Sequence, residues 1–451
     1  MTNPLINKSC DTAQDDELTI TPISWESLSP QQKVDSLSRP AISDETLLSA
    51  QVAKIVEQVK SEGDAALFSL TELFDQVKLK NLQVTSTQVA QAKTALTPQR
   101  IEALEMAYAQ IKRFHEAQIA QDIVVETCPG VVCTLKTEAI ESVGLYIPAG
   151  SAPLPSTVLM LGVPSQIAQC KRAVLVCPPD IQGNLANEVL VAASLCGITE
   201  IYTIGGAQAI AALAYGTETI PAVNKVFGPG NRYVTEAKKQ LSQLVPGFAI
   251  DMPAGPSEVL VIGDENANAD FIAADLLSQA EHGSDSQVIL LSDSMDLLNK
   301  VKLALASQLT LLSRADIANK ALSCSRLILT SDLNQAVEVS NLYGPEHLIV
   351  QTDNANELLL KLRNAGSIFV GAYTPESAGD YASGTNHVLP TYGYSKVVGS
   401  LSLADFTRRF TVQEISKTGL QNLAPTIIEL TEAEGLDAHQ RAVTIRLEAR
   451  N

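Results

Sequence analysis

The stretch that decides the fold runs from Arg172 to Leu241. It contains three short β-rich runs, RAVLVC (172–177), EIYTIGG (200–206) and NKVFGPG (224–230), which alternate with the helical runs NEVLVAASLCG (187–197), AQAIAALAYG (207–216) and NRYVTEAKKQL (231–241). Strands that alternate with helices of this length are typical of βαβ units, in which helices cover a parallel sheet. The sequence therefore predicts an α/β fold.

A second alternating series begins at SEVLVIG (257–263) and ends at SIFVG (367–371). Between them lie the helical run ADFIAADLLSQAEHG (269–283) and the apolar runs SQVILLS (286–292), SRLILTS (325–331) and EHLIV (346–350). The segment AIDMPAGPSE (249–258), which contains two Pro and one Gly, reads as a turn that joins the two series. We therefore expect two α/β modules in tandem.

The flanking segments differ in character. Residues 1–41 are polar and read as an arm without a core of its own, and helical patterning starts near Thr46. A long amphipathic helix is expected after Thr97, because Pro98 suits a first helical position and apolar residues recur from Ile101 to Phe114. Residues 371–394 lose all periodicity, which favours a functional loop. The last fifty residues read as mostly helical and too small for a separate core, so they should dock on something.

Composition excludes several classes of protein. The chain has 451 residues, 45% of them apolar and only 4% aromatic, with a net charge of −18. An acidic chain with few aromatic residues is unsuited to nucleic acid or to anionic lipid surfaces. No apolar run reaches the eighteen residues that a membrane span needs, and the first twenty residues lack an export or transit signal, so we expect a cytoplasmic protein. Seven cysteines without a C-x-x-C pair favour reduced thiols.

The five histidines are scarce enough for their positions to be informative. His115 lies in the long helix and is read as structural. His282 follows Gln279 by three residues at a helix end; the pair can converge on one metal ion, although the spacing alone favours a capped helix end. Glu346 and His347 form a carboxylate–imidazole pair just before an apolar run, which suits stepwise proton transfer, with a surface dipeptide as the alternative.

Three further features carry candidate residues. In the aperiodic loop, Asp380 could bind a cation or serve a turn, and His387 reads as structural; Glu434 and His439 in the tail fit a solvated helix face equally well. Three Gly-rich turns, at Tyr146, Gly205 and Gly228, each follow an expected strand and precede a helix, as phosphate-binding turns do. None has the G-x-G-x-x-G spacing, so a generic strand-to-helix turn remains open.

Eight segments, read in order, closely resemble the histidinol dehydrogenase family from about residue 40 to the C-terminus. They are GLYIPAGSAPLPSTVLM (144–160), GGAQAIAALAYGTE (205–218), FGPGNRYVTEAKK (227–239), IDMPAGPSEVL (250–260), DLLSQAEHG (275–283), YGPEHL (343–348), AGSIFVGAYTPESAGDYASGTNHVLPT (365–391) and EGLDAHQRAV (434–443). An ordered set of eight segments is far more specific than any single motif.

The resemblance implies a fold and an assembly. The expected fold has two incomplete Rossmann-like modules, a helical N-terminal region and a C-terminal helical tail exchanged in a homodimer. The implied domains are an arm (1–41), a discontinuous main domain (42–145 plus 257–401), an inserted NAD-contacting module (146–256) and a dimerising tail (402–451). One Zn²⁺ per subunit is expected on Gln279, His282, Asp380 and His439, with His439 supplied across the dimer interface.

The resemblance also implies the reaction, a four-electron oxidation of L-histidinol through L-histidinaldehyde to L-histidine that reduces two NAD, in histidine biosynthesis. Glu346 and His347 are the expected catalytic pair. The expected substrate contacts are Ser257, Gln279, His282, His347, Asp380, Glu434 and His439. The expected NAD contacts are Tyr146, Gln208 and Asn231, which lie in the three Gly-rich turns.

Three alternatives remain at this point. A thiohemiacetal route would use Cys133 or Cys170, but neither has an activating neighbour in the sequence. A metal-dependent hydrolase could use the same metal ligands with Glu346 as base. A catalytically silent NAD-binding protein would keep the turns but would not need both Glu346 and His347.

Overall fold

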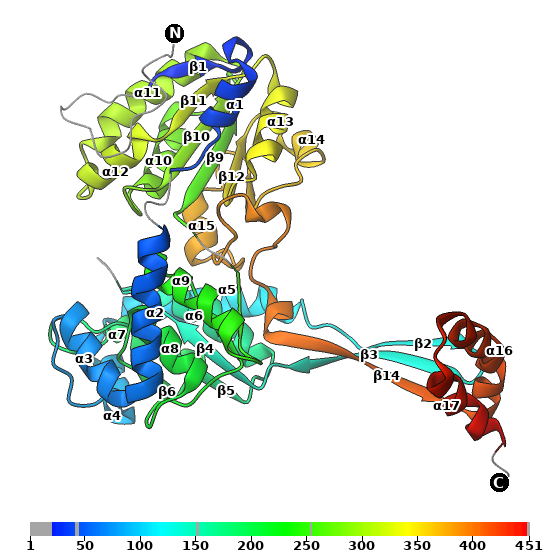
Figure 1. Cartoon of the computed structure of the whole chain (residues 1–451). Coiled ribbons are helices and arrows are strands. Elements are labelled where there is room, and N and C mark those ends of the chain that lie inside the picture. The colour runs from blue at the N-terminus through cyan, green and yellow to red at the C-terminus, as the bar shows by residue number, and fades with distance from the viewer. Residues whose placement is uncertain (1–19, 41–44, 150–152, 253–254, 449–451) are drawn as a thin grey trace.

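The computed structural model describes residues 20–40, 45–149, 153–252 and 255–448. Two parallel sheets with their helices form the body, one above the other in Figure 1, and a long narrow arm leaves one side of it. Within the described residues, no helix is long and apolar enough to cross a membrane. The α/β fold with parallel sheets is therefore confirmed.

The first sheet has five parallel strands, in the order β6 (Glu200–Tyr202), β5 (Arg172–Val176), β4 (Ser142–Tyr146), β7 (Lys225–Phe227) and β8 (Ala249–Ile250). The connecting helices are α6 (Pro155–Ile167), α7 (Asn187–Leu195), α8 (Gly206–Tyr215) and α9 (Arg232–Leu244). The chain moves outward from β4 to β6 and then returns to the other side of β4 at β7. In open α/β sheets such a reversal opens a ligand-binding crevice at the carboxyl ends of the two strands.

The second sheet has six parallel strands, in the order β1 (Pro22–Ser24), β11 (Arg326–Leu329), β10 (Gln287–Ser292), β9 (Glu258–Gly263), β12 (His347–Gln351) and β13 (Ser367–Val370). Its helices are α10 (Ala269–Ala280), α11 (Met295–Leu309), α12 (Ala315–Ser323), α13 (Leu333–Tyr343) and α14 (Ala355–Leu359). Every residue of β9, β10 and β12 is buried, as expected for strands covered by helices on both faces.

The carboxyl ends of the strands in the first sheet face the amino ends of the strands in the second; these rows of strand ends are called the carboxyl edge and the amino edge below. β8 ends at Ile250 and β9 begins at Glu258, so at most about 29 Å of extended chain separates the carboxyl ends of the strands in the first sheet from the amino ends of those in the second. The loop after Tyr381 reinforces this arrangement, because the side-chain amide of Asn386 donates to the Met160 carbonyl of α6 at 2.7 Å. Side chains from both edges can therefore contribute to one site.

The helices before β2 pack differently from the expected domain grouping. They are α2 (Glu45–Glu62), α3 (Asp64–Phe74), α4 (Ser86–Ala95) and α5 (Pro98–Glu116). α2 packs on α8 and α9, α4 on α7, and α5 on α6, so residues 45–116 pack mainly on the five-stranded sheet and its helices, although α5 also contacts Asn386 through His115. An apolar helix stripe shows which face is buried but not which partner covers it. The long helix after Thr97 is confirmed, and the Thr97 side chain caps it by accepting from the Arg100 N–H.

The N-terminal segment was expected to be an arm without a core of its own, and its described part, residues 20–40, packs on the body. β1 pairs with β11 and adds an edge strand to the six-stranded sheet, and α1 (Pro30–Ser36) follows it. A three-residue strand gives too short a pattern to be read from sequence. The rest of the expected arm, residues 1–19 and 41, lies outside the described residues.

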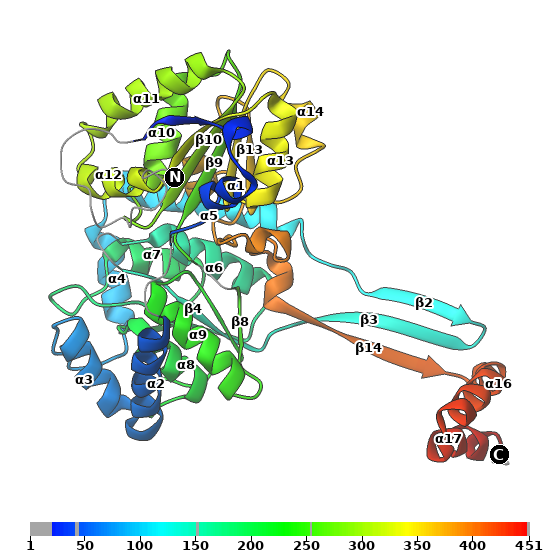
Figure 2. The same cartoon turned by 45° about the horizontal axis from the view of Figure 1, so that its top comes forward.

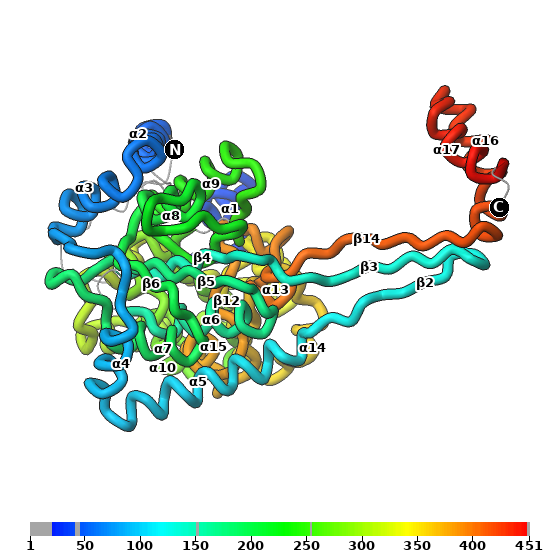
Figure 3. Tube along the Cα trace, turned by 90° about the horizontal axis from the view of Figure 1, so that it is seen from below, coloured from blue at the N-terminus to red at the C-terminus, as the bar shows by residue number. Residues whose placement is uncertain are grey.

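The long arm that leaves the body is not the N-terminal segment. It is an antiparallel ribbon that the sequence pattern did not predict. It consists of β2 (Ile123–Cys128), β3 (Val131–Ala139) and β14 (Thr407–Ile415), with β3 in the middle. Helices α16 (Lys417–Glu434) and α17 (Asp437–Glu448) pack on each other at its tip, as the arm in Figures 2 and 3 shows. The helical tail is thus confirmed, and a strand pairing across more than 260 residues connects it to the body.

The expectation of seven reduced cysteines is wrong for Cys324, which is disulfide-bonded. Five others carry free thiols: Cys128, Cys133, Cys170, Cys177 and Cys196. Cys10 lies outside the described residues.

Candidate active site

The candidate site lies at the amino edge of the six-stranded sheet, where three segments meet. α10 runs back from β9 toward this edge and carries Gln279 and His282 at its carboxyl end. Glu346 directly precedes β12 and His347 begins it, after Gly344 ends α13 in the left-handed conformation (φ +66°). A short helix, α15 (Glu376–Tyr381), adds Asp380 from within the segment that was expected to be an aperiodic loop.

Glu346 and His347 are both held by the backbone of Glu258, the first residue of β9. The Glu258 N–H donates to Glu346 Oε2 at 2.9 Å. His347 Nδ1 lies 3.0 Å from the Glu258 carbonyl oxygen, which can only accept, so Nδ1 carries the proton. His347 Nε2 is buried, has no hydrogen-bond partner among the described residues, and lies 3.7 Å from Asp380 Oδ1. The tautomer thus leaves Nε2 available to exchange a proton with a bound molecule.

Burial and crowding perturb the carboxyl groups of the site. Burial raises the pKa of Glu346 to about 7, and burial likewise raises the pKa of Glu376 to about 8. Burial opposes charge on His347, but the carboxylates of Glu376, Glu346 and Asp380 outweigh it and hold the His347 pKa well above its usual value. Burial also acts to raise the pKa of Asp380, yet the neighbouring His347 imidazole, 3.7 Å away, brings that pKa below the usual value. Such perturbed groups in one place favour a functional site.

Three residues beside Glu346 and His347 could hold a metal ion. One ligand atom each from His282, Glu376 and Asp380 lies within 4.8 Å of the other two. The Gln279 side chain packs against Glu376, and with its amide nitrogen turned toward that carboxylate it donates to Oε2 at 3.1 Å. Imidazole nitrogen with carboxylate and amide oxygens is a donor set that suits zinc and tolerates manganese or cobalt. The chemistry of these side chains therefore fits a divalent metal ion.

The structure brings together Gln279, His282 and Asp380 of the predicted metal set, and it adds Glu376, which sequence reasoning missed. Glu376 precedes Asp380 by four residues, a spacing that puts both carboxylates on one face of a helix, and this signal was available in the sequence. His439 and Glu434 lie elsewhere. Both are exposed on the helices at the tip of the arm, remote from the body of their own chain in Figure 1.

Two other residues named from the sequence lie at the same edge. Ser257 comes directly before β9, where its carbonyl accepts from the Gln287 N–H at 3.2 Å. His387 Nδ1 donates to the Asp380 carbonyl at 3.0 Å, and its Nε2 accepts from the Thr157 hydroxyl of α6 at 3.2 Å. His387 therefore joins the Asp380 helix to the five-stranded module, which agrees with a structural role.

The predicted NAD residues gather at the carboxyl edge of the five-stranded sheet, on both sides of the reversal between β4 and β7. Tyr146 ends β4, and its hydroxyl accepts from the Gly206 N–H, next to Gln208 in the first turn of α8. Asn231 caps α9 by accepting from the N–H groups of Tyr233 and Val234, at 3.0 and 3.2 Å. The amino ends of α8 and α9 thus lie where a dinucleotide phosphate would be stabilised.

The Gly228 turn shows why the glycine is required there. Gly228 has a φ of +119°, and a Cβ at this position would lie 2.1 Å from the Tyr146 carbonyl oxygen. Only glycine permits this approach between the ends of β7 and β4.

The two candidate nucleophilic cysteines lie away from this site. Cys133 is on β3 in the arm. Cys170 lies between α6 and β5, where burial raises the pKa of its thiol to about 11. Neither is placed or activated for the thiohemiacetal route.

Comparison with known proteins agrees with this arrangement. The family model for histidinol dehydrogenase matches residues 37–447. Histidinol dehydrogenase of Colwellia psychrerythraea is 76% identical over 426 residues, which cover 94% of this chain and 98% of that protein, and the Vibrio cholerae enzyme is 60% identical, covering 94% and 97%. The crystal structure of histidinol dehydrogenase from Elizabethkingia anophelis matches with a TM-score of 0.92 at 44% identity, covering 96% of this chain and 99% of that one. The chain belongs to the histidinol dehydrogenase family.

Proposed function

We propose that this chain oxidises L-histidinol to L-histidine through L-histidinaldehyde, in two steps that each reduce one NAD, as the last reaction of histidine biosynthesis. Family membership supports the substrate and the reaction class. The observation that carries the proposal is the buried Glu346–His347 pair beside Gln279, His282 and Asp380, at an edge that faces the Gly-rich turns of the other sheet. Two consecutive oxidations need repeated proton removal next to a nicotinamide, and this arrangement supplies the acceptors.

Gln279, His282 and Asp380 would hold a Zn²⁺ ion together with His439 of the partner subunit. When bound, the ion would supply a Lewis acid that anchors the imidazole and amine of histidinol. Glu376 lies against Gln279 and keeps its amide oriented. Glu434 of the partner subunit would offer a counter-charge to the substrate amine, and Ser257 lies at the same edge as a further contact.

His347 and Glu346 divide the proton transfers. In the first step His347 Nε2 takes the hydroxyl proton of histidinol while the carbinol hydride passes to NAD. Glu346 then takes a proton from the water that adds to the aldehyde carbonyl, while His347 returns its proton to the carbonyl oxygen, which gives the hydrated aldehyde and leaves Nε2 free for the next step. In the second step His347 takes a proton from the hydrated aldehyde as the second hydride leaves, which gives the carboxylic acid. Each positioned proton transfer is worth about a hundredfold to ten-thousandfold in rate.

NAD would bind along the carboxyl edge of the five-stranded sheet. Tyr146, Gln208 and Asn231 flank the reversal between β4 and β7, and the amino ends of α8 and α9 would face the diphosphate. Because the opposite sheet edge carries His347, the nicotinamide would reach the carbinol carbon across the gap between the two modules. Each oxidation consumes one NAD, so the cofactor must exchange while the aldehyde stays bound.

The arm supports a homodimer in which a second copy completes the site. Every residue of β2 from Ile123 to Thr127 is exposed, including Ile123 (53%), Val124 (64%) and Val125 (49%), and no residue of α17 is buried. Apolar strands on an isolated ribbon are a liability unless a partner covers them. A second copy seated on this arm would bring His439 and Glu434 of the partner subunit to the metal-binding residues.

The experiment that tests the proposal follows NADH absorbance after histidinol is added to the purified enzyme. We expect NADH formation that a chelator abolishes and Zn²⁺ restores, with no hydrolysis of histidine esters or amides. Hydrolysis without NADH would favour the metal-dependent hydrolase, and NAD binding without turnover would favour the silent binding protein.

A further inference from the structure

We propose that Arg39 is a positioning residue for the catalytic pair: by fixing Glu258, it holds the backbone groups against which Glu346 and His347 are set. Nothing in the sequence reading gave residues before 42 a role at the site. The inference rests on the proposed function where its readout is histidinol oxidation.

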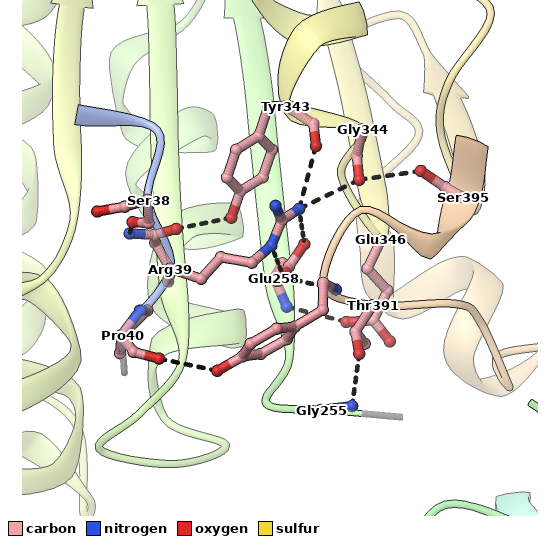
Figure 4. Close-up of polar contacts among 12 residues, drawn as sticks. Ser38, Arg39, Pro40, Gly255, Glu258, Tyr343, Gly344, Glu346, Thr391 and Ser395 are labelled. Atoms are coloured by element: carbon pink, nitrogen blue, oxygen red, sulfur yellow. Dashed lines mark hydrogen bonds and ion pairs between the residues drawn. The ribbon is translucent and has the colours of Figure 1, made fainter. Parts of the chain in front are cut away.

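Arg39 is locked by contacts on all sides (Figure 4). Its Nε and Nη2 form a two-pronged ion pair with the Glu258 carboxylate, with Nη2 2.9 Å from Oε2, and the two side chains are 14% and 2% exposed. Nη2 also donates to the carbonyls of Tyr343 and Gly344 at 3.2 and 3.3 Å, and the guanidinium lies 4.0 Å from the centroid of the Tyr343 ring. A guanidinium that donates two parallel hydrogen bonds to one carboxylate fixes the orientation of that carboxylate and also compensates its negative charge.

Glu258 in turn holds both residues of the proposed catalytic pair through its backbone. Its N–H donates to Glu346 Oε2 at 2.9 Å, and its carbonyl accepts from His347 Nδ1 at 3.0 Å. The same carboxylate that Arg39 holds also accepts from the Tyr392 N–H at 2.9 Å. A rotation of the Glu258 backbone would therefore shift the Glu346 carboxylate and the His347 ring together.

The segment that carries Arg39 is itself tied to the sheet edge. The Ser38 carbonyl accepts from the Gln287 side-chain amide at 3.1 Å, and the Pro40 carbonyl accepts from the Tyr392 hydroxyl at 2.8 Å. Without Arg39, the Glu258 carboxylate would be a buried charge without a cationic partner, and the backbone would move to hydrate it. A displacement of about 1 Å at reacting groups can cost about a hundredfold in rate.

Arg39→Met tests the proposal, with Arg172→Met as the matched control. Arg172 makes the same two-pronged pair with Glu200, at 2.8 Å for both contacts, between β5 and β6 of the other sheet. For Arg39→Met we expect kcat with histidinol to fall about 30-fold to 100-fold, while KM for histidinol and for NAD and the zinc content stay within about threefold. Arg172→Met should keep kcat within about twofold of wild type. Arg39→Lys keeps the positive charge but cannot donate two parallel hydrogen bonds, so its kcat should lie between those of wild type and Arg39→Met.

Two further measurements separate positioning from loss of fold and from failure of the proposed function. The double variant Arg39→Met/Glu258→Gln removes both charges, so we expect it to regain thermal stability but not kcat; recovery of kcat would overturn the positioning role. In NMR spectra of the zinc-bound enzyme, assigned with His347→Asn, Arg39→Met should shift the His347 ring signals and leave those of His115 unchanged. Unshifted His347 signals, or wild-type kcat in Arg39→Met, would contradict the inference. If the wild-type enzyme did not oxidise histidinol but Arg39→Met still shifted the His347 ring signals, the proposed function would be wrong and the positioning role of Arg39 would stand.

Discussion

At the scale of single residues, the division of labour between Glu346 and His347 can be separated by substitution. His347→Asn should lower kcat for histidinol at least a hundredfold, because both oxidations in the proposed mechanism would use its proton transfer. Glu346→Gln should mainly slow hydration of the aldehyde, so that NADH per histidinol falls toward one and histidinaldehyde is trapped by a carbonyl reagent. Glu338→Gln, at an exposed position on α13, is the matched control and should leave both values unchanged. Equal losses in both oxidation steps of Glu346→Gln would contradict this assignment.

Asp275 on α10 makes the stability of the metal-free protein dependent on pH. Burial raises the pKa of this carboxyl to about 7, against the opposing hydrogen bond from Gln351, whose side-chain amide donates to it at 2.9 Å. Between the unfolded pKa, near 4, and about 7 the folded state keeps a proton that the unfolded state releases, so the free energy of unfolding falls as pH rises through this window. Asp275→Asn should therefore gain melting temperature over wild type increasingly from about pH 5 to about pH 7, with a plateau above. A pH-independent difference in calorimetry would disagree.

At the scale of elements, a buried ion pair braces the turn proposed to hold NAD. Lys238 Nζ on α9 donates to Asp251 Oδ1 at 2.8 Å and also to the Gly228 carbonyl, and Asp251 Oδ2 accepts from the Gly228 N–H at 2.8 Å. Lys238→Met should raise KM for NAD about tenfold with little change in KM for histidinol, because it loosens the turn but not the opposite sheet edge. Lys239→Met, at the exposed neighbouring position, is the control. Equal rises in the KM for NAD and the KM for histidinol in Lys238→Met would contradict the proposal that the two ligands bind at the ends of different sheets.

Elements with a local signal could be predicted from the sequence, and those that depend on remote partners could not. The strand–helix alternation, the Thr97-capped helix and the placement of Gln279 and His282 at a helix end were all readable. The ribbon of β2, β3 and β14 was not, because its middle and outer strands pair across more than 260 residues. The six-residue helix α15 is too short for a periodic pattern, so Glu376 was missed although its spacing to Asp380 was visible.

At the scale of the whole molecule, the proposed shared site can be tested by subunit complementation. His439→Ala and His282→Ala should each be inactive as homodimers, because each removes one proposed metal ligand from every site. When the two are unfolded together and refolded, each mixed dimer would contain one intact site, so random pairing should restore about a quarter of wild-type activity. Arg441→Ala, also on α17, is the control and should stay active alone. No recovery would place His439 outside the partner's site.

The grouping of the helices is also a property of the whole molecule. Residue patterns showed that α2 and α5 have a buried face, but only the assembled structure shows that the face covers the five-stranded sheet module. The same limit applies to Arg39, whose partner Glu258 lies 219 residues away. Resemblance to a family supplied the proposed catalytic and metal-binding residues, whereas the side chains that hold them in place were found from contacts between distant parts of the sequence.

Counting the NADH formed per histidinol consumed tests the central proposal most directly. The zinc-bound wild-type enzyme, with excess NAD, should form two NADH for each histidinol and release histidine. One NADH per histidinol with free aldehyde as product would contradict the account, because it would leave only a single alcohol oxidation.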